Sequence, residues 1–424
     1  MKITTDTVIV GTGVAGLFCA LNLPDDKNVL IITKSEVTKS DSFLAQGGIC
    51  MMQGEEDYES YFEDTMRAGH YENNERSVDI MLRSSQSVIE ELIGYGVDFA
   101  KNPDGSLKLT REGAHSRPRI CFHEDITGKE ITSKLLEEVK KRKNIQIAEN
   151  LTMIDIIEKN GRCVGIIARH PDGIMTEIDA KFTVLATGGI GGIYENSTNY
   201  PHLTADSIAI AMKHKIELSS LDYVQIHPTT LYQKKSGRRF LISESVRGEG
   251  AVLLGKDMKR FTNELMPRDV VSAAIAEQMK KDNKPYVWLS LENIPKSDIL
   301  SHFPNIYEKC LEEGYDITKE PIPVVPAQHY FMGGIKVDEN SKTSMDCLYA
   351  AGETSCNGVH GRNRLASNSL LESLVFAQRC ARHITEVFDL YQPVTPDICL
   401  DDFKDCDKDY IQTVKDEIER IKNK

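Results

Sequence analysis

A chain of 424 residues exceeds what one ordinary core holds, so we expect two or three domains. Hydrophobic residues make up 40% of it and charged residues 27%, as in ordinary globular proteins. The net charge of -13 argues against broad attraction to nucleic acid or to an anionic membrane, but it is compatible with a local basic pocket for a small anion. Residues 1–10 lack the long apolar stretch of a signal peptide, and no apolar run has the length of a membrane span. These features together predict a cytoplasmic protein.

Ten cysteines are spread along the chain without a CxxC pair. This spacing indicates neither a zinc ribbon nor a set of iron–sulfur ligands, and we expect no metal site. A disulfide framework is untypical of a chain this long without a secretory signal. The cysteines are therefore predicted to be reduced and mostly buried.

The N-terminal segment has the pattern of a dinucleotide-binding turn. Residues 7–10 form a β-branched run without alternation, as in a strand buried on both faces. They lead into Gly11-Thr12-Gly13-Val14-Ala15-Gly16, followed by an expected helix at residues 17–23 and a second strand at residues 29–32. In this context Gly11 permits the tight turn, Gly13 lets backbone amides approach a pyrophosphate, and Gly16 lets the helix pack closely on the sheet. The phosphates would lie at the positive end of the helix.

The second strand does not decide which dinucleotide binds. An acid usually ends this strand, but Thr33-Lys34 occupies the place here, and Lys34 is a candidate for a ribose or phosphate contact. Two later strands favour a flavoprotein over a nicotinamide dehydrogenase. Residues 182–189 end in Ala-Thr-Gly-Gly, and residues 348–353 end in Ala-Gly-Glu. Their glycines let the chain pass close to a cofactor, and Glu353 can accept hydrogen bonds from ribityl or ribose hydroxyls.

Six further segments occur in an order that resembles the succinate dehydrogenase/fumarate reductase flavoproteins. They are residues 42–48 (SFLAQGG), 227–229 (HPT), 247–250 (RGEG), 267–269 (PRD), 329–334 (HYFMGG) and 361–371 (GRNRLASNSLL). Each run alone is weak, but the collinear set is specific and covers the chain from residue 1 to about 385.

The resemblance implies FAD as the cofactor. Beside the glycine turn, Lys34 and Glu353, it implies flavin contacts from Asp41, Ser42, Gln46, Gly47, Gly48, Asp206, Ser369 and Leu370. Asp41 occupies the place of the histidine that attaches FAD covalently in the membrane-complex members, so a noncovalent flavin is expected. Around Asp206 the family's TGDG reads Thr204-Ala205-Asp206-Ser207, a departure that predicts a different local backbone.

The stretch Thr110-Arg111-Glu112-Gly113-Ala114-His115-Ser116 resembles the L-aspartate oxidases, in which the matching glutamate orients the substrate's amino group. The succinate and fumarate enzymes act on substrates without an amine and usually lack this acid. The alternative, that Glu112 is a solvated loop residue, stays open on this stretch alone.

The same resemblance implies the residues that bind and convert a C4 dicarboxylate. Arg364 would be the bidentate carboxylate clamp, with further donors from His227, His329 and Ser243, the last standing where threonine is common. Arg268 matches the family's proton-transfer residue, and Glu244 and Arg247 would form a relay to it, although a guanidinium is normally protonated.

The implied fold is α/β. A Rossmann-like FAD-binding domain in two segments, residues 1–225 and 326–385, would surround an inserted α+β capping domain at residues 226–325. Residues 386–424 would form a short C-terminal helical tail, leaving the family's helical-bundle domain largely absent. Inside the cap we expect a helix at residues 269–281 and a strand at residues 286–289, and the prolines of residues 321–326 predict an extended linker.

The function that the resemblance implies is FAD-dependent oxidation of L-aspartate to iminoaspartate, with electrons expected to pass to oxygen or fumarate. The resemblance places this reaction in the quinolinate route to NAD and implies quinolinate synthase as a partner. Two alternatives remain: a soluble fumarate reductase or succinate dehydrogenase flavoprotein, and a flavin-binding scaffold that has lost turnover. A nicotinamide-only dehydrogenase explains neither the QGG run nor the AGE run.

Overall fold

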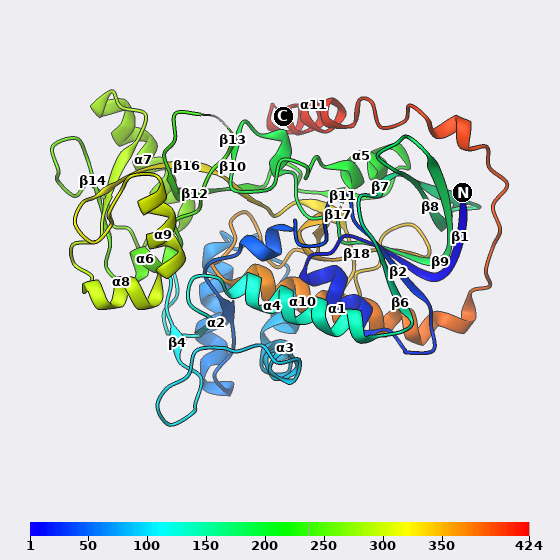
Figure 1. Ribbon diagram of the computed structural model, residues 1–424, viewed down its shortest axis with the longest axis horizontal. Coiled ribbons are helices and arrows are strands. Elements are labelled where there is room, and N and C mark those ends of the chain that lie inside the picture. Colours follow the sequence, from blue (N-terminus) through cyan, green and yellow to red (C-terminus); the bar gives the residue numbers. More distant parts are fainter. Residues whose placement is uncertain (236, 424) are drawn as a thin grey trace.

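The computed structural model describes residues 1–235 and 237–423 and has a mixed α/β fold with two main sheets (Figure 1). The larger sheet has seven strands, and a parallel layer forms most of it. In spatial order this layer is β6 (Ile145–Ala148), β2 (Val29–Ile32), β1 (Lys2–Val10), β9 (Met175–Leu185) and β18 (Leu348–Ala350). A hairpin of β7 (Thr152–Lys159) and β8 (Arg162–Arg169) extends it in antiparallel fashion along β9.

Helices cover both faces of this sheet. One face carries α1 (Val14–Asn22), α4 (Thr127–Lys141) and α10 (Asn368–Val387), with α3 (Glu75–Gly94) and α2 (Glu55–Ala68) packed outside them. The other face carries α5 (Asp206–Lys213) and α11 (Tyr410–Lys422). Strand β1 contributes side chains to the hydrophobic cores on both faces of the sheet. Ile9 packs into the core that contains α1 and α10, while Val8 and Val10 pack into the core that contains α5 and α11.

The second sheet lies at the opposite end of the molecule (Figure 1). Its strands are β13 (Gly237–Arg238), β10 (Asn196–Ser197), β16 (Ile322–Phe331), β15 (Val287–Ser290) and β14 (Val252–Leu254), with β12 (Val224–Leu231) also paired to β16. Four helices accompany it: α6 (Glu244–Gly248), α7 (Arg268–Asp282), α8 (Lys296–His302) and α9 (Pro304–Glu312). This end has a core of its own, running from Leu231 to Val324.

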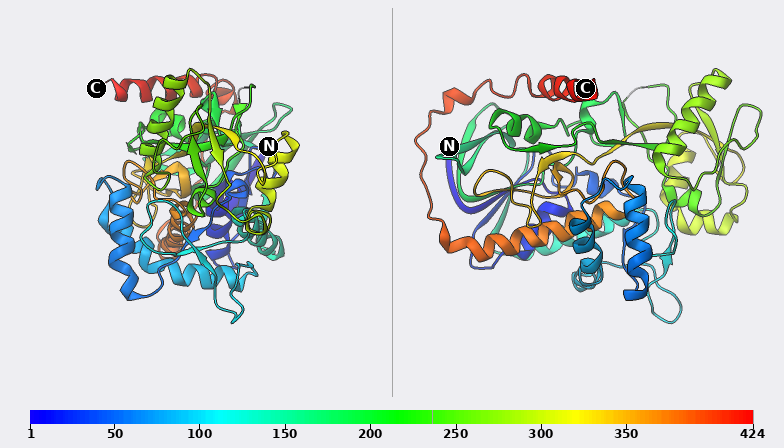
Figure 2. Two further views of the ribbon diagram at one scale, coloured as in Figure 1. Left: turned by 90° about the vertical axis from the view of Figure 1, so that its left-hand side faces the viewer. Right: turned by 180° about the vertical axis from the view of Figure 1, so that it is seen from behind.

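Short strands and single helical turns complete the fold. One small sheet joins β11 (Leu218–Ser219), β17 (Gly334–Lys336) and β19 (Ser355–Cys356), and another joins β3 (Ile49–Cys50), β5 (Ile120–Cys121) and β4 (Leu109–Thr110). The 3-10 turns are η1 (Asp41–Leu44), η2 (Gly191–Ile193), η3 (Gly352–Thr354), η4 (Phe388–Leu390) and η5 (Leu400–Phe403). Figure 2 shows the C-terminal tail leaving α10, passing around the edge of the larger sheet and ending in α11. No helix among the described residues is both long enough and apolar enough to cross a bilayer.

The expected linker at residues 321–326 is wrong. The segment is extended, but Ile322–Phe331 forms β16, which pairs with β15 on one side and β12 on the other. Pro326 is tolerated because the β12 pairing is irregular there: the register shifts between His227 and Thr230, opposite this proline.

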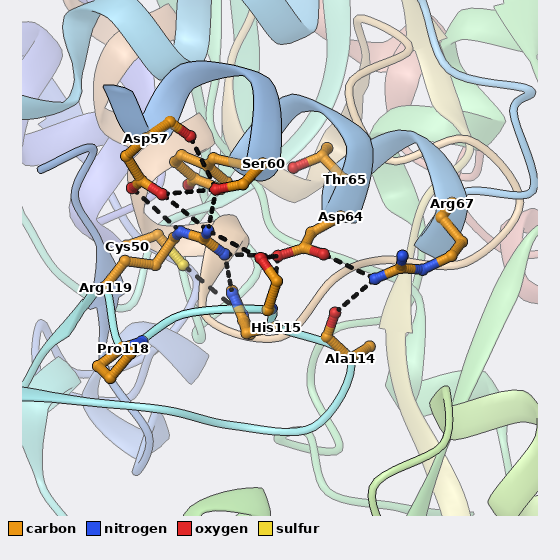
Figure 3. A network of polar contacts seen from close by, with 12 residues as sticks. Cys50, Asp57, Ser60, Asp64, Thr65, Arg67, Ala114, His115, Pro118 and Arg119 are labelled. Carbon is orange, nitrogen blue, oxygen red and sulfur yellow. Dashed lines mark hydrogen bonds and ion pairs between the residues drawn. The ribbon is translucent and has the colours of Figure 1, made fainter. Parts of the chain in front are cut away.

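The segment that carries Glu112 is braced by a buried ion-pair network (Figure 3). The Arg119 side chain is 0% exposed and donates to Asp57 at 2.9 Å and to Asp64 at 2.7 Å, both on α2. Asp64 also accepts from the backbone N–H and the hydroxyl of Ser116, at 2.6 and 2.7 Å. Burial opposes ionisation of Asp64, but these donors outweigh it and hold its pKa below the usual value.

His115 extends the brace to the segment that precedes α10. Its Nδ1 accepts from Arg119 at 3.0 Å, and its Nε2 donates to the carbonyl oxygen of Ala366 at 3.0 Å. Burial and the Arg119 charge lower the pKa of His115 to about 4, so the ring is neutral, which this bonding pattern requires. Helix α2, the Glu112 segment and the residues before α10 are thus joined by one set of bonds.

We expect Arg119→Ala to destabilise the protein by about 3–5 kcal/mol, because it takes the buried cation away from both aspartates and leaves Asp57 without an ion-pair partner among the described residues. Arg67→Ala is the matched control: Arg67 also bonds Asp64, at 2.6 Å, but its side chain is 49% exposed. The control should cost no more than about 1 kcal/mol. Urea unfolding of the two variants measures the difference, and equal losses would contradict the brace.

Candidate active site

The glycine turn lies where β1 ends and α1 begins. Gly11 has φ +120°, and a Cβ on it would lie 2.0 Å from the carbonyl oxygen of Ala186, so other residues do not fit there. A Cβ on Gly16 would lie 2.1 Å from the carbonyl oxygen of Gly11. The first N–H groups of α1 therefore open onto a close-packed turn, which is the arrangement that accepts a phosphate.

One cavity collects most of the residues predicted from the sequence. It is lined by every predicted cofactor contact except Gly16, and by every predicted substrate or proton-transfer residue except Arg247. Gly16 lies behind the turn. Arg247 is fully buried behind Glu244, 3.5 Å from its carboxylate, and donates to the carbonyl oxygen of Glu264. The flavin segments and the cap thus contribute to a single site.

At one part of the cavity Lys34 meets Asp206. The Lys34 ammonium donates to Asp206 and to the Thr204 hydroxyl, each at 2.6 Å. Ala205 has φ +64° in the left-handed region, where the family's glycine would be unstrained. Ser207 bonds Thr187 and Thr354, each at 2.7 Å, so its hydroxyl ties α5 to the two later flavin strands.

Two carboxyl groups of the cavity have strongly raised pKa values. Burial raises the pKa of Asp41 to about 7, and burial together with Asp41 raises the pKa of Glu353 to about 8. One oxygen of Asp41 accepts from the Tyr200 N–H at 2.9 Å, while the other is buried and finds no partner in the part of the chain that the structure describes. Gly189 packs against Glu353, since a Cβ there would lie 2.2 Å from its carboxylate. An unpaired acceptor beside glycine-lined backbone fits a cofactor with hydroxyl and amide donors, as FAD has.

A second group of residues in the cavity is rich in hydrogen-bond donors. Arg364 lies 4.3 Å from the ring centre of Tyr330 and donates to Ser369 at 3.0 Å, while its Nε has no partner within the described chain. Burial and Arg268 lower the pKa of Arg364 to about 10, so the guanidinium stays charged at neutral pH.

Two histidines complete this donor-rich part, with ring centroids 5.0 Å apart. Burial, then the charge of Arg268, holds the pKa of His227 and of His329 well below the usual value. The rings are therefore neutral donors. Nδ1 of His227 lies 3.1 Å from the carbonyl oxygen of Thr229 and 3.2 Å from its N–H, and its buried Nε2 has no partner among the described residues. This free ring nitrogen and the unpaired N–H at Nε of Arg364 are available to a ligand, and the guanidinium suits a carboxylate.

Arg268 begins α7 and is held on two sides. Its Nε donates to Glu244 at 2.6 Å, and its Nη1 donates to Gln225 at 2.9 Å. Gln225 in turn donates to the carbonyl oxygen of Arg364 at 2.8 Å. Gln225 therefore links the two arginines, a role that its place two residues before His227 did not indicate.

Glu112 is buried in the cavity wall, 3% exposed, and is not a solvated loop residue. Ser245 donates to one of its carboxylate oxygens at 2.8 Å and Ser367 to the other at 2.6 Å. Burial and the neighbouring Glu244 raise its pKa above the usual value. Neither serine was predicted as a partner of Glu112, although Ser367 lies within the run at residues 361–371.

Comparison with known proteins agrees with this geometry. A family model described as "FAD binding domain" matches residues 6–370. A Clostridium perfringens protein named L-aspartate oxidase is 54% identical over 390 residues, covering 92% of this chain and 88% of that protein. One of the same name from Neisseria meningitidis is 40% identical over 396 residues, covering 91% of this chain and 79% of its own. Among solved structures, an E. coli quinol fumarate reductase superposes with a TM-score of 0.87 at 30% identity, covering 99% of this chain and 74% of the other.

The family match spans most of the chain, and the glycine turn, the unpaired acceptor and the buried carboxyl groups of the cavity fit the cofactor that it names. The relatives named above are matched over most of their own length. The chain therefore belongs to the L-aspartate oxidases, a family of flavoproteins built on this FAD binding domain.

Proposed function

We propose that this protein oxidises L-aspartate to iminoaspartate with noncovalent FAD. The observation that carries the proposal is the buried Glu112 carboxylate, which lines the same cavity as Arg364, His227 and His329. A dicarboxylate without an amine gives no reason to bury an anion there, because burial of an unpaired charge is costly. An α-ammonium group supplies the missing cation.

The two substrate carboxylates are assigned to the donor-rich part of the cavity. Arg364 offers a charged, planar fork, and the neutral His227 and His329 add N–H donors without further positive charge. Ser243 adds a hydroxyl. With both ends of the substrate and its ammonium group held, C2 has one orientation in the site.

Oxidation removes a hydride from C2 and a proton from the ammonium nitrogen, which leaves iminoaspartate. Bound FAD would supply the two-electron acceptor for the hydride. We assign proton transfer to Arg268, whose bond to Glu244 at 2.6 Å gives the proton a route away from the substrate. Arg247, close behind Glu244, supports this route from outside the cavity.

The proposal extends to the electron acceptor, the enzyme that uses the product and the cellular compartment. We infer that the electrons pass on to oxygen or fumarate, and that iminoaspartate is consumed by quinolinate synthase on the route to NAD. The ten cysteines are all free and eight of them are buried, which suits a reducing compartment such as the cytoplasm.

A fumarate reductase or succinate dehydrogenase activity is the second candidate. The superposition on a quinol fumarate reductase favours it, and Arg268, Arg364, His227 and His329 serve a plain dicarboxylate equally well. Glu112 is the feature that distinguishes the two candidates.

Noncovalent binding of FAD predicts that acid precipitation of the holoenzyme releases the flavin. Asp41 occupies the place of the attaching histidine, and its carboxylate accepts from the backbone N–H of Tyr200. We expect yellow supernatant and a colourless pellet, read by absorbance and by fluorescence of the denatured pellet on a gel. Fluorescence that stays with the polypeptide would contradict this.

Arg364→Leu should weaken succinate binding by about two orders of magnitude, because a carboxylate loses its charge-assisted bidentate partner. FAD should remain bound. Titrating succinate against the flavin spectrum gives the dissociation constant. The matched control is Arg362→Leu, two residues away with a side chain that is 63% exposed, which should bind succinate as the wild type does. If Arg364→Leu binds succinate with the wild-type dissociation constant, Arg364 is not the carboxylate clamp.

Glu112→Gln should strongly reduce oxidation of L-aspartate and should affect reduction of fumarate by dithionite-reduced enzyme far less, since fumarate has no ammonium group. A folding defect would lower both activities together. Equal loss in the two assays, or loss in neither, would favour the plain dicarboxylate enzyme.

The pH dependence follows from the raised pKa of Glu112. Its neutral form predominates at low pH and cannot pair with an ammonium group, so kcat/KM for L-aspartate should rise with pH through that pKa. This acidic limb should disappear in Glu112→Gln and should be absent from fumarate reduction in the wild type.

A further inference from the structure

The carboxylate of Glu112 is held by two hydroxyl groups, one on each oxygen. Ser245 donates to Oε1 at 2.8 Å and Ser367 donates to Oε2 at 2.6 Å. Both serines are buried, 7% and 8% exposed. Because each oxygen receives one donor, the plane of the carboxylate is fixed, and each oxygen keeps acceptor capacity for a third group.

The two serines belong to different parts of the site. Ser245 lies on α6 directly after Glu244, the residue that holds Arg268. Ser367 follows Arg364 by three residues, and its hydroxyl also accepts from the Gly48 N–H at 3.2 Å. The Glu112 carboxylate is therefore tied on one side to the proton-transfer residues and on the other to the carboxylate clamp and the QGG run.

The backbone around Glu112 is shaped for these bonds. Ser367 has φ +61°, a left-handed conformation that is uncommon for serine. Gly47 packs against Glu112, and a Cβ on Gly47 would lie 2.6 Å from Oε1. Such strain and close approach persist where the surrounding contacts enforce them, often at functional positions.

We propose that Ser245 and Ser367 are positioning residues that set the preference for amino-dicarboxylates over plain dicarboxylates, by aligning the Glu112 carboxylate with the substrate's ammonium group. The inference rests on the proposed function of Glu112. Neither serine is assigned a contact with the substrate, so their effect passes through Glu112 and is specific to substrates that carry an amine.

The groups around Glu112 predict how the loss of either serine hydroxyl changes the pKa of its carboxyl group. Burial and the like charge of Glu244 raise its pKa, while Ser367, Arg268 and Ser245 lower it. Arg247 and the buried Cys50 thiol also face it. Removing either hydroxyl takes away a stabilising donor, so the neutral form of Glu112 persists to higher pH.

The test compares Ser245→Ala and Ser367→Ala with the wild-type holoenzyme. Each variant should lose about tenfold in kcat/KM for L-aspartate, and its acidic limb should move to higher pH by about one unit, as for loss of one hydrogen bond to a charged group. Reduction of fumarate and binding of succinate should change by no more than about twofold. Ser77→Ala is the matched control, because Ser77 is a buried serine that donates to the carbonyl oxygen of Asn357, and it should keep the wild-type profile.

Two further variants distinguish loss of the hydroxyl from a general folding defect. Ser245→Thr keeps the hydroxyl on α6 and should restore the wild-type profile. Ser367→Gly relieves the left-handed strain while still removing the hydroxyl, so it should match Ser367→Ala. In a Glu112→Gln background, Ser245→Ala should add no further loss, because residues that act through one group are not additive.

An unmoved acidic limb in the serine variants, or a further loss in the Glu112→Gln background, would overturn the inference. In that case aspartate oxidation by the wild type and its loss in Glu112→Gln leave the proposed function standing. A wild-type holoenzyme that does not oxidise L-aspartate would overturn both.

Discussion

The arrangement of the site depends on the buried ion pairs between Arg119 and two aspartates of α2. A guanidinium with no exposed surface is tolerated only where nearly all its donors find acceptors, and Asp57, Asp64, Ser60 and His115 supply them. Because His115 also bonds Ala366, the brace reaches the residues just before α10. The Glu112 segment is thereby positioned between a helix and the segment that carries Arg364 and Ser367.

The cavity contains two groups of buried ionisable residues, and burial affects their charges in different ways. Around Asp41 and Glu353, burial raises the pKa of both carboxyl groups, so they gain protons near neutral pH and carry less negative charge. At the substrate part, burial keeps His227 and His329 neutral, so positive charge rests on the arginines alone. Glu244 compensates Arg268 there, whereas Arg364 has no ion-pair partner among the described residues. Of these two arginines, Arg364 is therefore the one whose guanidinium lacks a carboxylate partner among the described residues.

Local sequence patterns predicted the helices and strands that depend on residues close together in the chain. The strand, glycine turn, helix and second strand at the N-terminus are present as expected, and the predicted helix at residues 269–281 is α7 (Arg268–Asp282). The solvated-loop alternative for Glu112 is wrong, and only the fold could show this, because the serines that bond it lie 133 and 255 residues away. The linker expected at residues 321–326 failed for the same reason: β16 gains its partners from β12 and β15, which no property of a proline-rich run reveals.

The Ala205 and Ser207 departures illustrate the limit of a motif. A missing glycine predicted a different backbone, yet Ala205 adopts the left-handed conformation itself, and Ser207 adds bonds to Thr187 and Thr354. The surrounding contacts thus decide the backbone more than the identity of one residue does.

The larger sheet is completed by β18, which pairs with β9 although more than 160 residues separate them. A chain still emerging from the ribosome has the glycine turn early, but it lacks Glu353, Arg364 and the helix α10 that packs on α1 until most of its length has been made. The cofactor pocket therefore closes late, and flavin capture waits until the residues up to α10 have been made. A nascent protein that stalls before residue 348 exposes the edge of β9 to other strands, so premature termination is expected to yield aggregation-prone fragments instead of partly active ones.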